Sequence, residues 1–255
     1  MNRELNPQVY ARVGGTLYLT MIALGLFEEL VVRGRIVVSG NAAATFANLQ
    51  KMEMLWRAGI AAELLMVILT IVLSVVLYVL TRPVHQELAL LGLLFGAIAL
   101  AVEGAYTMQL VEALFPLGSN AFLSAFTPAQ LHAMTALAMK AHVIGFGIAL
   151  LLFGPFFFVT GYLIFRSGYF PKPLGVLYQL GGLAYMINGL VLVLAPQFAG
   201  RAFPIMGVAF LGEVSFALWL LIKGVDLERW PGVILSEAKD LPGGIGEDPS
   251  PAGSG

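Results

Sequence analysis

The 255-residue chain contains no cysteine and little charge, and both absences narrow what the protein can be. Without cysteine it has no disulfide framework, no thiolate metal ligand and no cysteine nucleophile. Only 11% of its residues are Asp, Glu, Lys or Arg, and the formal net charge is −1. A soluble domain is about one quarter charged, and a nucleic-acid-binding domain carries a basic surface. The composition therefore excludes a soluble globular protein and a nucleic-acid partner.

Long apolar segments are what the chain has instead. Hydrophobic residues make up 59% of it, and the mean hydropathy is +0.87. A transmembrane helix needs about 20 predominantly apolar residues, and a helix satisfies its own backbone polar groups in lipid. The sequence therefore predicts an all-α, polytopic membrane protein, a bundle of six transmembrane helices. The spans lie near residues 13–33, 57–80, 88–114, 141–166, 173–196 and 204–224.

The composition divides the chain into three parts. Residues 1–12 form an N-terminal segment, residues 13–230 the transmembrane helical domain, and residues 231–255 a tail rich in Pro, Gly, Ser and acids, which predicts disorder. Within the domain, an alanine-rich stretch in the 34–56 loop predicts a short interfacial helix. The helical pattern from Pro128 to Lys140 predicts that the fourth helix begins ahead of its membrane span.

Three glutamates lie inside predicted spans, where a charged side chain costs about 2.5–3.5 kcal/mol on insertion scales. They are Glu63, Glu103 and Glu213, and Glu29, Arg33 and His142 lie near span ends. Helical spacing places Glu63 on a stripe of small and polar residues, which predicts that it faces the bundle interior.

Two interpretations of these acids stay open. In the functional one, they bind a cation, relay protons or hold a charged substrate. In the structural one, protonated glutamates hydrogen-bond between helices or pair with Lys140, Arg33 or His142. No metal site is predicted, because His132 and His142 lie about 15 Å apart on a continuous helix. No catalytic residue and no particular cofactor can be named.

The segment from Glu28 to Gly34 has the form EExxxRG. It resembles the first motif of the CAAX-type intramembrane proteases, in which, as the resemblance implies, paired glutamates activate water and an arginine assists. That family also has FxxxH and HxxxN/D motifs. None of the three histidines of this chain has a Phe four residues before it, or an Asn or Asp four residues after it. An intramembrane hydrolase is therefore an alternative hypothesis with an incomplete site.

A longer resemblance rests on the run GYLIFRSGYFPKPLG, together with RVGGTLY and GNAAAT nearer the N-terminus. These segments resemble the bacterial multi-pass family called domain of unknown function 4386, over roughly residues 10–225. The matching motif residues are Gly161, Tyr162, Arg166, Ser167, Gly168, Pro171, Leu174 and Gly175. Their physical interpretation is a basic, proline-containing turn at the membrane surface. The resemblance implies a bacterial inner-membrane protein and no particular activity.

Location and function follow as expectations. An even number of spans places both termini on one side, and Arg166 with Lys172 in a loop without acids favours the cytoplasmic side. The lipid bilayer is the expected partner, a small molecule or ion is possible, and a protein partner is unknown. The leading hypothesis is a small transporter, an ion or proton pathway, or a ligand-binding membrane protein. A structural or partner-binding subunit is a second alternative to this hypothesis, beside the hydrolase.

Overall fold

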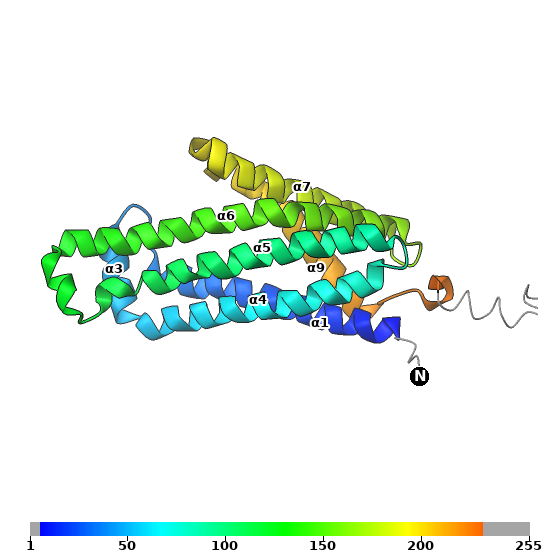
Figure 1. The fold of residues 1–255 in the computed structure, drawn as a ribbon, viewed down its shortest axis with the longest axis horizontal. Coiled ribbons are helices and arrows are strands. Elements are labelled where there is room, and N and C mark those ends of the chain that lie inside the picture. The colour runs from blue at the N-terminus through cyan, green and yellow to red at the C-terminus, as the bar shows by residue number, and fades with distance from the viewer. Residues whose placement is uncertain (1–5, 232–255) are drawn as a thin grey trace, which may run out of the picture.

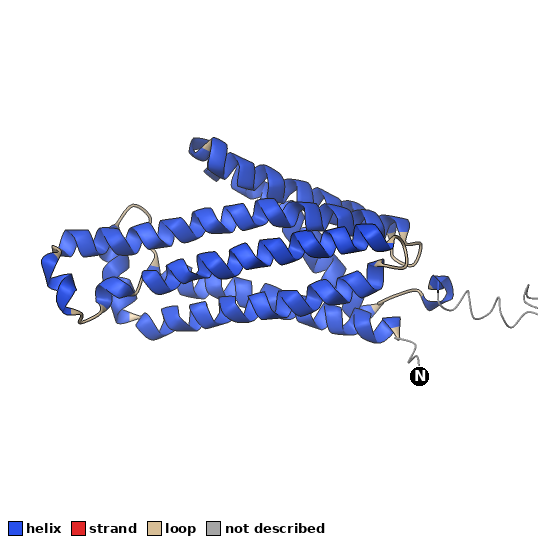
Figure 2. Ribbon diagram, viewed as in Figure 1, coloured by secondary structure: helices blue, strands red, loops and turns tan. Residues whose placement is uncertain are grey.

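The computed structural model describes residues 6–231, and within this range every regular element is a helix (Figures 1 and 2). The long helices and the crossing helix α3 are α1 (Pro7–Leu26), α3 (Ala42–Lys51), α4 (Glu53–Thr81), α5 (Gln86–Glu112), α6 (Pro128–Arg166), α7 (Lys172–Leu194) and α9 (Met206–Ile222). Shorter helices join them: η1 (Phe27–Arg33), α2 (Gly34–Ile36), η2 (Phe115–Leu117), η3 (Ala121–Ala125), η4 (Pro196–Phe198), α8 (Ala199–Ala202), η5 (Phe203–Ile205) and η6 (Leu227–Arg229). The predicted all-α class is confirmed.

Six helices form a closed ring. In spatial order α1 packs on α4, α4 on α5, α5 on α6, α6 on α7, α7 on α9, and α9 again on α1. Large apolar side chains point outward from these helices, for example Ile68, Leu94 and Ile187. Five helical stretches are long and apolar enough to cross a membrane. An apolar exterior around a satisfied helical backbone is the arrangement that lipid requires.

The sixth predicted span is shorter than the others. The prediction begins it near residue 204, but α9 begins at Met206 and has 17 residues. At 1.5 Å per residue this helix is about 25 Å long, which is less than the hydrocarbon thickness of about 30 Å. Proline explains part of the late start, because Pro204 lies in the separate turn η5. The described residues therefore contain five long apolar helices and one short one, and a count of six spans is not established.

The other boundaries follow local capping chemistry. The Asn6 side chain accepts the Gln8 N–H, so α1 begins earlier than the predicted span. Thr127 and Gln130 form a reciprocal capping box at the start of α6, which then runs unbroken for 39 residues to Arg166. The predicted early start of the fourth helix is confirmed. Apart from Pro231, the tail predicted to be disordered lies outside the described residues.

Glycines hold α6 and α7 at close range. Three glycines at seven-residue spacing on each helix face one another in antiparallel order, pairing Gly147 with Gly189, Gly154 with Gly182, and Gly161 with Gly175. A β-carbon added at Gly175 would lie 2.6 Å from the Gly161 carbonyl oxygen. Small residues let helix backbones approach closely in membranes. Two of the predicted motif residues, Gly161 and Gly175, therefore form one of these contacts.

The two ends of the bundle differ. At one end α3 crosses the long helices, and α6 extends well beyond its neighbours (Figure 1). At the other end the start of α1 meets the end of α9, where the Gln8 side chain bonds the Lys223 carbonyl and the Val225 N–H. We call the first the α3 end and the second the terminal end. The polar residues of interest lie at different depths between them.

Candidate functional site

A buried cluster of polar side chains lies inside the bundle, in the half nearer the α3 end. At its centre Nε2 of His142 on α6 lies 3.0 Å from Oε1 and 3.2 Å from Oε2 of Glu63 on α4. The hydroxyl of Thr107 on α5 donates to the same Oε1 at 3.0 Å. All three side chains are buried. Three helices therefore meet at one carboxyl group.

The second ring nitrogen of His142 faces an arginine. Nη1 of Arg33 lies 3.2 Å from Nδ1 of His142. A guanidinium group only donates hydrogen bonds, so Nδ1 must accept, and the ring proton is on Nε2, directed at Glu63. The imidazole is neutral in this arrangement, and its two partners fix its orientation. His142 thus connects a permanent cation to a buried carboxyl group.

Arg33 also contacts both glutamates of the EExxxR segment. Its Nε lies 3.2 Å from Oε2 of Glu29, and its Nη1 lies 3.9 Å from Oε1 of Glu28. The segment is a π-helix, η1, whose wider turn brings residues four and five positions apart onto one face. Single π-helical turns occur frequently at functional sites. The local winding is therefore what lets one arginine reach both acids.

Exposure falls steadily along this chain of contacts. The side chain of Glu29 is 66% exposed and that of Arg33 is 17% exposed. His142 and Glu63 follow at 6% and 4%. The contacts therefore lead from the surface of the bundle to its interior. We call Glu28, Glu29, Arg33, His142, Glu63 and Thr107 the acidic cluster.

Close helix packing holds the acidic cluster together. The Tyr106 ring packs edge-on against the His142 ring at 4.8 Å, and its β-carbon lies against Gly145 on α6. On the other side Val32 of η1 lies against Gly59, one helical turn before Glu63. Neither contact has room for a larger residue. These glycines let η1 and α5 approach near enough for the polar groups to meet.

The two remaining predicted acids, Glu103 and Glu213, are not members of the acidic cluster. Glu103 is on α5, one turn before Thr107, whose hydroxyl also lies 2.9 Å from the Glu103 carbonyl oxygen. Glu213 on α9 accepts a hydrogen bond from the Tyr185 hydroxyl, and Tyr185 belongs to α7. No hydrogen bond or ion pair among the described residues joins Glu213 to the acidic cluster. Glu213 therefore lies apart from the acidic cluster, whereas Glu103 lies beside it, one helical turn from Thr107.

A second polar group surrounds Glu213. The hydroxyls of Tyr18 on α1 and Tyr178 on α7 lie 2.9 Å apart, and both tyrosines are buried. Together with Tyr185 these residues form the tyrosine cluster, at the junction of α1, α7 and α9.

Thr107 is the one member of the acidic cluster that the sequence analysis did not identify. Its position four residues after Glu103, on the same helix face, is the signal that could have found it.

The positions of the histidines and acids also limit metal binding. The His132 ring packs beside Phe46, with ring centroids 4.6 Å apart, and is not part of the acidic cluster. Within residues 6–231 no group of three or more His, Asp or Glu side chains is arranged to hold a metal ion. Both nitrogens of His142 already have protein partners. The reactive groups of the acidic cluster are therefore its carboxyl groups and the guanidinium of Arg33.

The predicted motif residues after Gly161 form the turn between α6 and α7. Gly168 has φ of +76°, a left-handed conformation that favours glycine. The Ser167 hydroxyl accepts the Phe170 N–H at 3.1 Å, and Pro171 precedes the first residue of α7. Leu174 is buried, whereas Tyr162 and Arg166 are exposed. These residues build a tight turn at the terminal end, as their pattern predicts.

Comparison with known proteins gives a family. A family model described as "Domain of unknown function (DUF4386)" matches residues 13–224. An uncharacterized protein of Archaeoglobus fulgidus is 32% identical over 165 residues, which is 65% of this chain and 83% of that protein. No solved structure matches the chain. Because this relative is archaeal, the expected bacterial inner membrane stays a prediction. The matched range covers the helix ring from Val13 in α1 onward and the acidic cluster, and the chain belongs to the family of domain of unknown function 4386.

Proposed function

We propose that this protein binds protons within the membrane at Glu63 and works as a small proton-coupled transporter or proton pathway. The observation that carries the proposal is the hydrogen bonding of the Glu63 carboxyl group to His142 and Thr107. A carboxyl group at such a depth is costly in its charged form. The protein nevertheless places it beside donors that favour the carboxylate and beside a hydroxyl that can also accept.

Both protonation states of Glu63 have hydrogen-bond partners in this geometry. As a carboxylate, Glu63 accepts from Nε2 of His142 and from the Thr107 hydroxyl. As a carboxylic acid, it can donate to Thr107, whose hydroxyl then donates to the Glu103 carbonyl oxygen at 2.9 Å. A proton can therefore be gained or lost with a hydroxyl rotation and no helix movement. Such reversibility suits a proton-binding group.

The surface acids supply an approach for protons. Glu29 is exposed, and Glu28, which is 13% exposed, lies 3.9 Å from Nη1 of Arg33, the nitrogen that also faces His142. Two carboxyl groups contact the one guanidinium of the acidic cluster, and a third, that of Glu63, is joined to it only through His142, so the cluster has more acids than one arginine can neutralise. Uncompensated charge is costly in hydrocarbon, and this composition favours capture of a small cation, of which the proton is the smallest.

Infrared titration of the purified protein tests proton binding directly. Over a pH titration we expect carboxylic-acid C=O bands that change with pH. The band of Glu63 should disappear in Glu63→Gln, while the bands of the other acids inside the helices, Glu103 and Glu213, remain. Glu53→Gln is the matched control, because Glu53 lies on the same helix, its side chain is 42% exposed, and its partner among the described residues is Arg57. Loss of the band in both variants, or in neither, would contradict the assignment to Glu63.

Proton movement needs a second experiment in closed liposomes. With a pH dye inside and a potassium-driven membrane potential, wild-type protein should acidify the lumen faster than empty liposomes do. Glu63→Gln should lower this rate to the empty-liposome level, while Glu53→Gln should not. A titrating band without proton flux would favour a transporter that moves protons only with its substrate. Neither band nor flux would favour the structural or partner-binding alternative.

An intramembrane hydrolase has one observation in its favour. Glu28 and Glu29 meet His142 through Arg33, so the EExxxR segment does lie near a histidine. The same contacts disfavour it, because both ring nitrogens of that histidine are engaged and His142 is not free to act as a base. Cleavage of a membrane-tethered peptide by wild-type protein, and its loss in Glu29→Gln, would establish this alternative.

The membrane arrangement belongs to the proposal. We place α9 in the bilayer as a short sixth span, because it closes the ring between α7 and α1. The terminal end then faces the cytoplasm, as the Arg166 and Lys172 loop favours. In this orientation the acidic cluster lies toward the opposite membrane surface. Labelling of Ser39→Cys and Arg82→Cys, both at exposed positions, with a membrane-impermeant reagent before and after permeabilising the cells would determine the orientation.

A further inference from the structure

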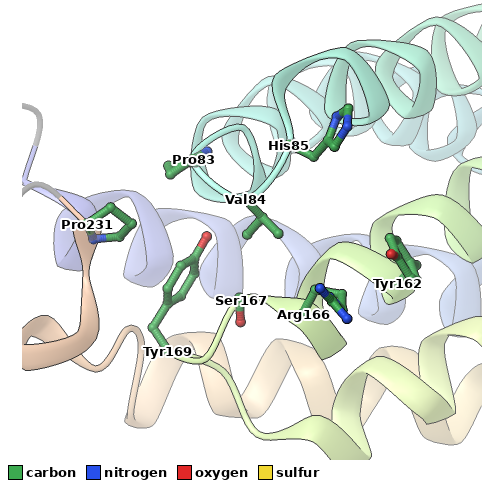
Figure 3. Close-up of a pocket in the computed structure, with 8 residues that line it drawn as sticks. All are labelled: Pro83, Val84, His85, Tyr162, Arg166, Ser167, Tyr169 and Pro231. Atoms are coloured by element: carbon green, nitrogen blue, oxygen red, sulfur yellow. The ribbon is translucent and has the colours of Figure 1, made fainter.

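A pocket of about 320 Å³ lies at the terminal end, remote in the fold from the acidic cluster (Figure 3). Three parts of the chain line it: the α4–α5 turn, the end of α6 with the turn that follows, and Pro231. Figure 3 shows Tyr162 and Arg166 along α6, with His85 facing them from the start of α5. Small-molecule pockets begin at about 300 Å³, so the space suits a small headgroup.

The wall formed by the turn after α6 is rigid. The left-handed Gly168 and the Ser167–Phe170 hydrogen bond shape the turn. The Tyr169 hydroxyl donates to the Leu80 carbonyl oxygen at 2.7 Å and so joins this turn to the end of α4. The Asp226 N–H donates to the Tyr169 carbonyl oxygen at 3.3 Å. The pocket therefore has fixed walls, as a ligand site needs.

Arg166 gives the pocket its chemical character. Among the described residues Arg166 forms no ion pair, although its guanidinium lines the cavity. His85 lines the opposite side, and its Nδ1 is occupied by the Leu88 N–H and the Glu87 carboxylate. Tyr162 adds a hydroxyl. An unpaired guanidinium with a nearby hydroxyl matches the oxygens of a phosphate group.

We propose that this pocket binds a phosphate-bearing ligand, with Arg166 as the principal contact. The surroundings support an anion, because basic residues outnumber acids at the terminal end. The basic residues are Arg12, Arg82, Arg166, Lys172, Lys223 and Arg229, and the acids among the described residues there are Glu87, Asp226 and Glu228. A lipid headgroup and a soluble phosphate ester share this chemistry. The proposal does not depend on proton binding at Glu63.

Native mass spectrometry of the delipidated protein in detergent can distinguish a lipid headgroup from a soluble phosphate ester as the ligand. The probes are dioleoyl phosphatidylglycerol, inorganic phosphate and glycerol 3-phosphate, each at low and at high salt. We expect saturable binding that weakens with salt, because screening reduces charge attraction. Arg166→Gln should weaken it about tenfold, the usual effect of losing one charge-assisted hydrogen bond. Arg82→Gln is the matched control, since Arg82 lies at the same end but does not line the pocket.

Each outcome decides the question. Binding of phosphatidylglycerol alone, lost in Arg166→Gln and kept in Arg82→Gln, identifies a headgroup site. Binding of the soluble phosphates with the same variant pattern identifies a soluble-ligand site. Equal weakening in both variants would show attraction to a general basic surface and would overturn the proposal. Absence of binding by folded wild-type protein, or unchanged binding in Arg166→Gln, would overturn it as well.

Discussion

Gly59 of α4 lies directly against Val32 of η1, and the contact has no space for a β-carbon. A β-carbon built on Gly59 would lie 2.9 Å from Cγ1 of Val32. Valine is β-branched and cannot easily rotate away. This contact fixes how near η1 comes to α4, and hence whether Arg33 can reach His142. The acidic cluster therefore depends on an apolar contact that contributes no polar atom.

Gly59→Ala should consequently destabilise the protein and loosen the acidic cluster. We expect a loss of about 1–3 kcal/mol, the usual cost of overpacking, measured by thermal or denaturant unfolding in detergent. Gly104→Ala is the matched control, because its β-carbon would meet nothing within 4 Å. In a helix interior that change should be neutral or stabilise by about 0.5–1 kcal/mol. Equal effects of the two substitutions would refute the packing argument.

His142→Ala should cost about 3 kcal/mol or more of stability. It leaves Glu63 and Arg33 without their shared partner, and an uncompensated buried charge is expensive. Combining it with Glu63→Gln should cost less than the sum of the two single changes, because both remove one interaction. Glu213→Gln should instead add to Glu63→Gln, since Glu213 belongs to the tyrosine cluster. Non-additivity with Glu213 would show that the two clusters act as one.

Gly182→Ala should separate α6 from α7. Its β-carbon would lie 2.6 Å from the Gly154 carbonyl oxygen and 2.8 Å from the Phe158 nitrogen. Both are backbone atoms, so no side chain can move aside, and we expect a loss of about 2 kcal/mol or more. Gly207→Ala, whose β-carbon would meet nothing within 4 Å, should have little effect. Unfolding midpoints of the two variants give the comparison.

Tyr169→Phe should change stability in a pH-dependent way. Burial raises the pKa of Tyr169 above its ordinary value of 10.0. A group whose pKa is raised by folding contributes stability that is full below the unfolded pKa and declines as the pH rises above it. Near neutral pH the variant should lose about 1 kcal/mol with the hydrogen bond to Leu80. Above pH 10 the gap from wild type should narrow, and a constant gap would contradict this account.

The fold was largely readable from the chain, because lipid leaves few choices. Apolar runs of sufficient length must be helices, and capping residues such as Thr127 mark where they begin. The extension of α6 toward Pro128 also followed from local pattern. The length of α9 did not follow from the local pattern, because composition alone does not show that the turn around Pro204 is separate from the helix. The order of the ring depends on contacts between distant segments.

The candidate site was likewise predictable from the sequence only in part. The cost of charge in hydrocarbon was enough to single out Glu63, Glu103 and Glu213 as unusual. Which of them lie together was not readable, because helix rotation and depth are set by packing at positions such as Gly59 and Gly145. The π-helical winding of η1, which turns Glu28 and Glu29 toward one arginine, also has no reliable local signature.

By itself the sequence indicated a helical protein with long apolar segments suited to a membrane and a few acids within them, since hydropathy and helical period are local properties. Only the tertiary structure decided that Glu63 meets His142 and Thr107, with Arg33 at the other ring nitrogen of His142, while Glu213 bonds to Tyr185. It also decided that Arg166 lines a pocket instead of only anchoring a helix end. The physical reason is that polar partners come from helices far apart in the chain, and close packing at glycines selects which helices are neighbours.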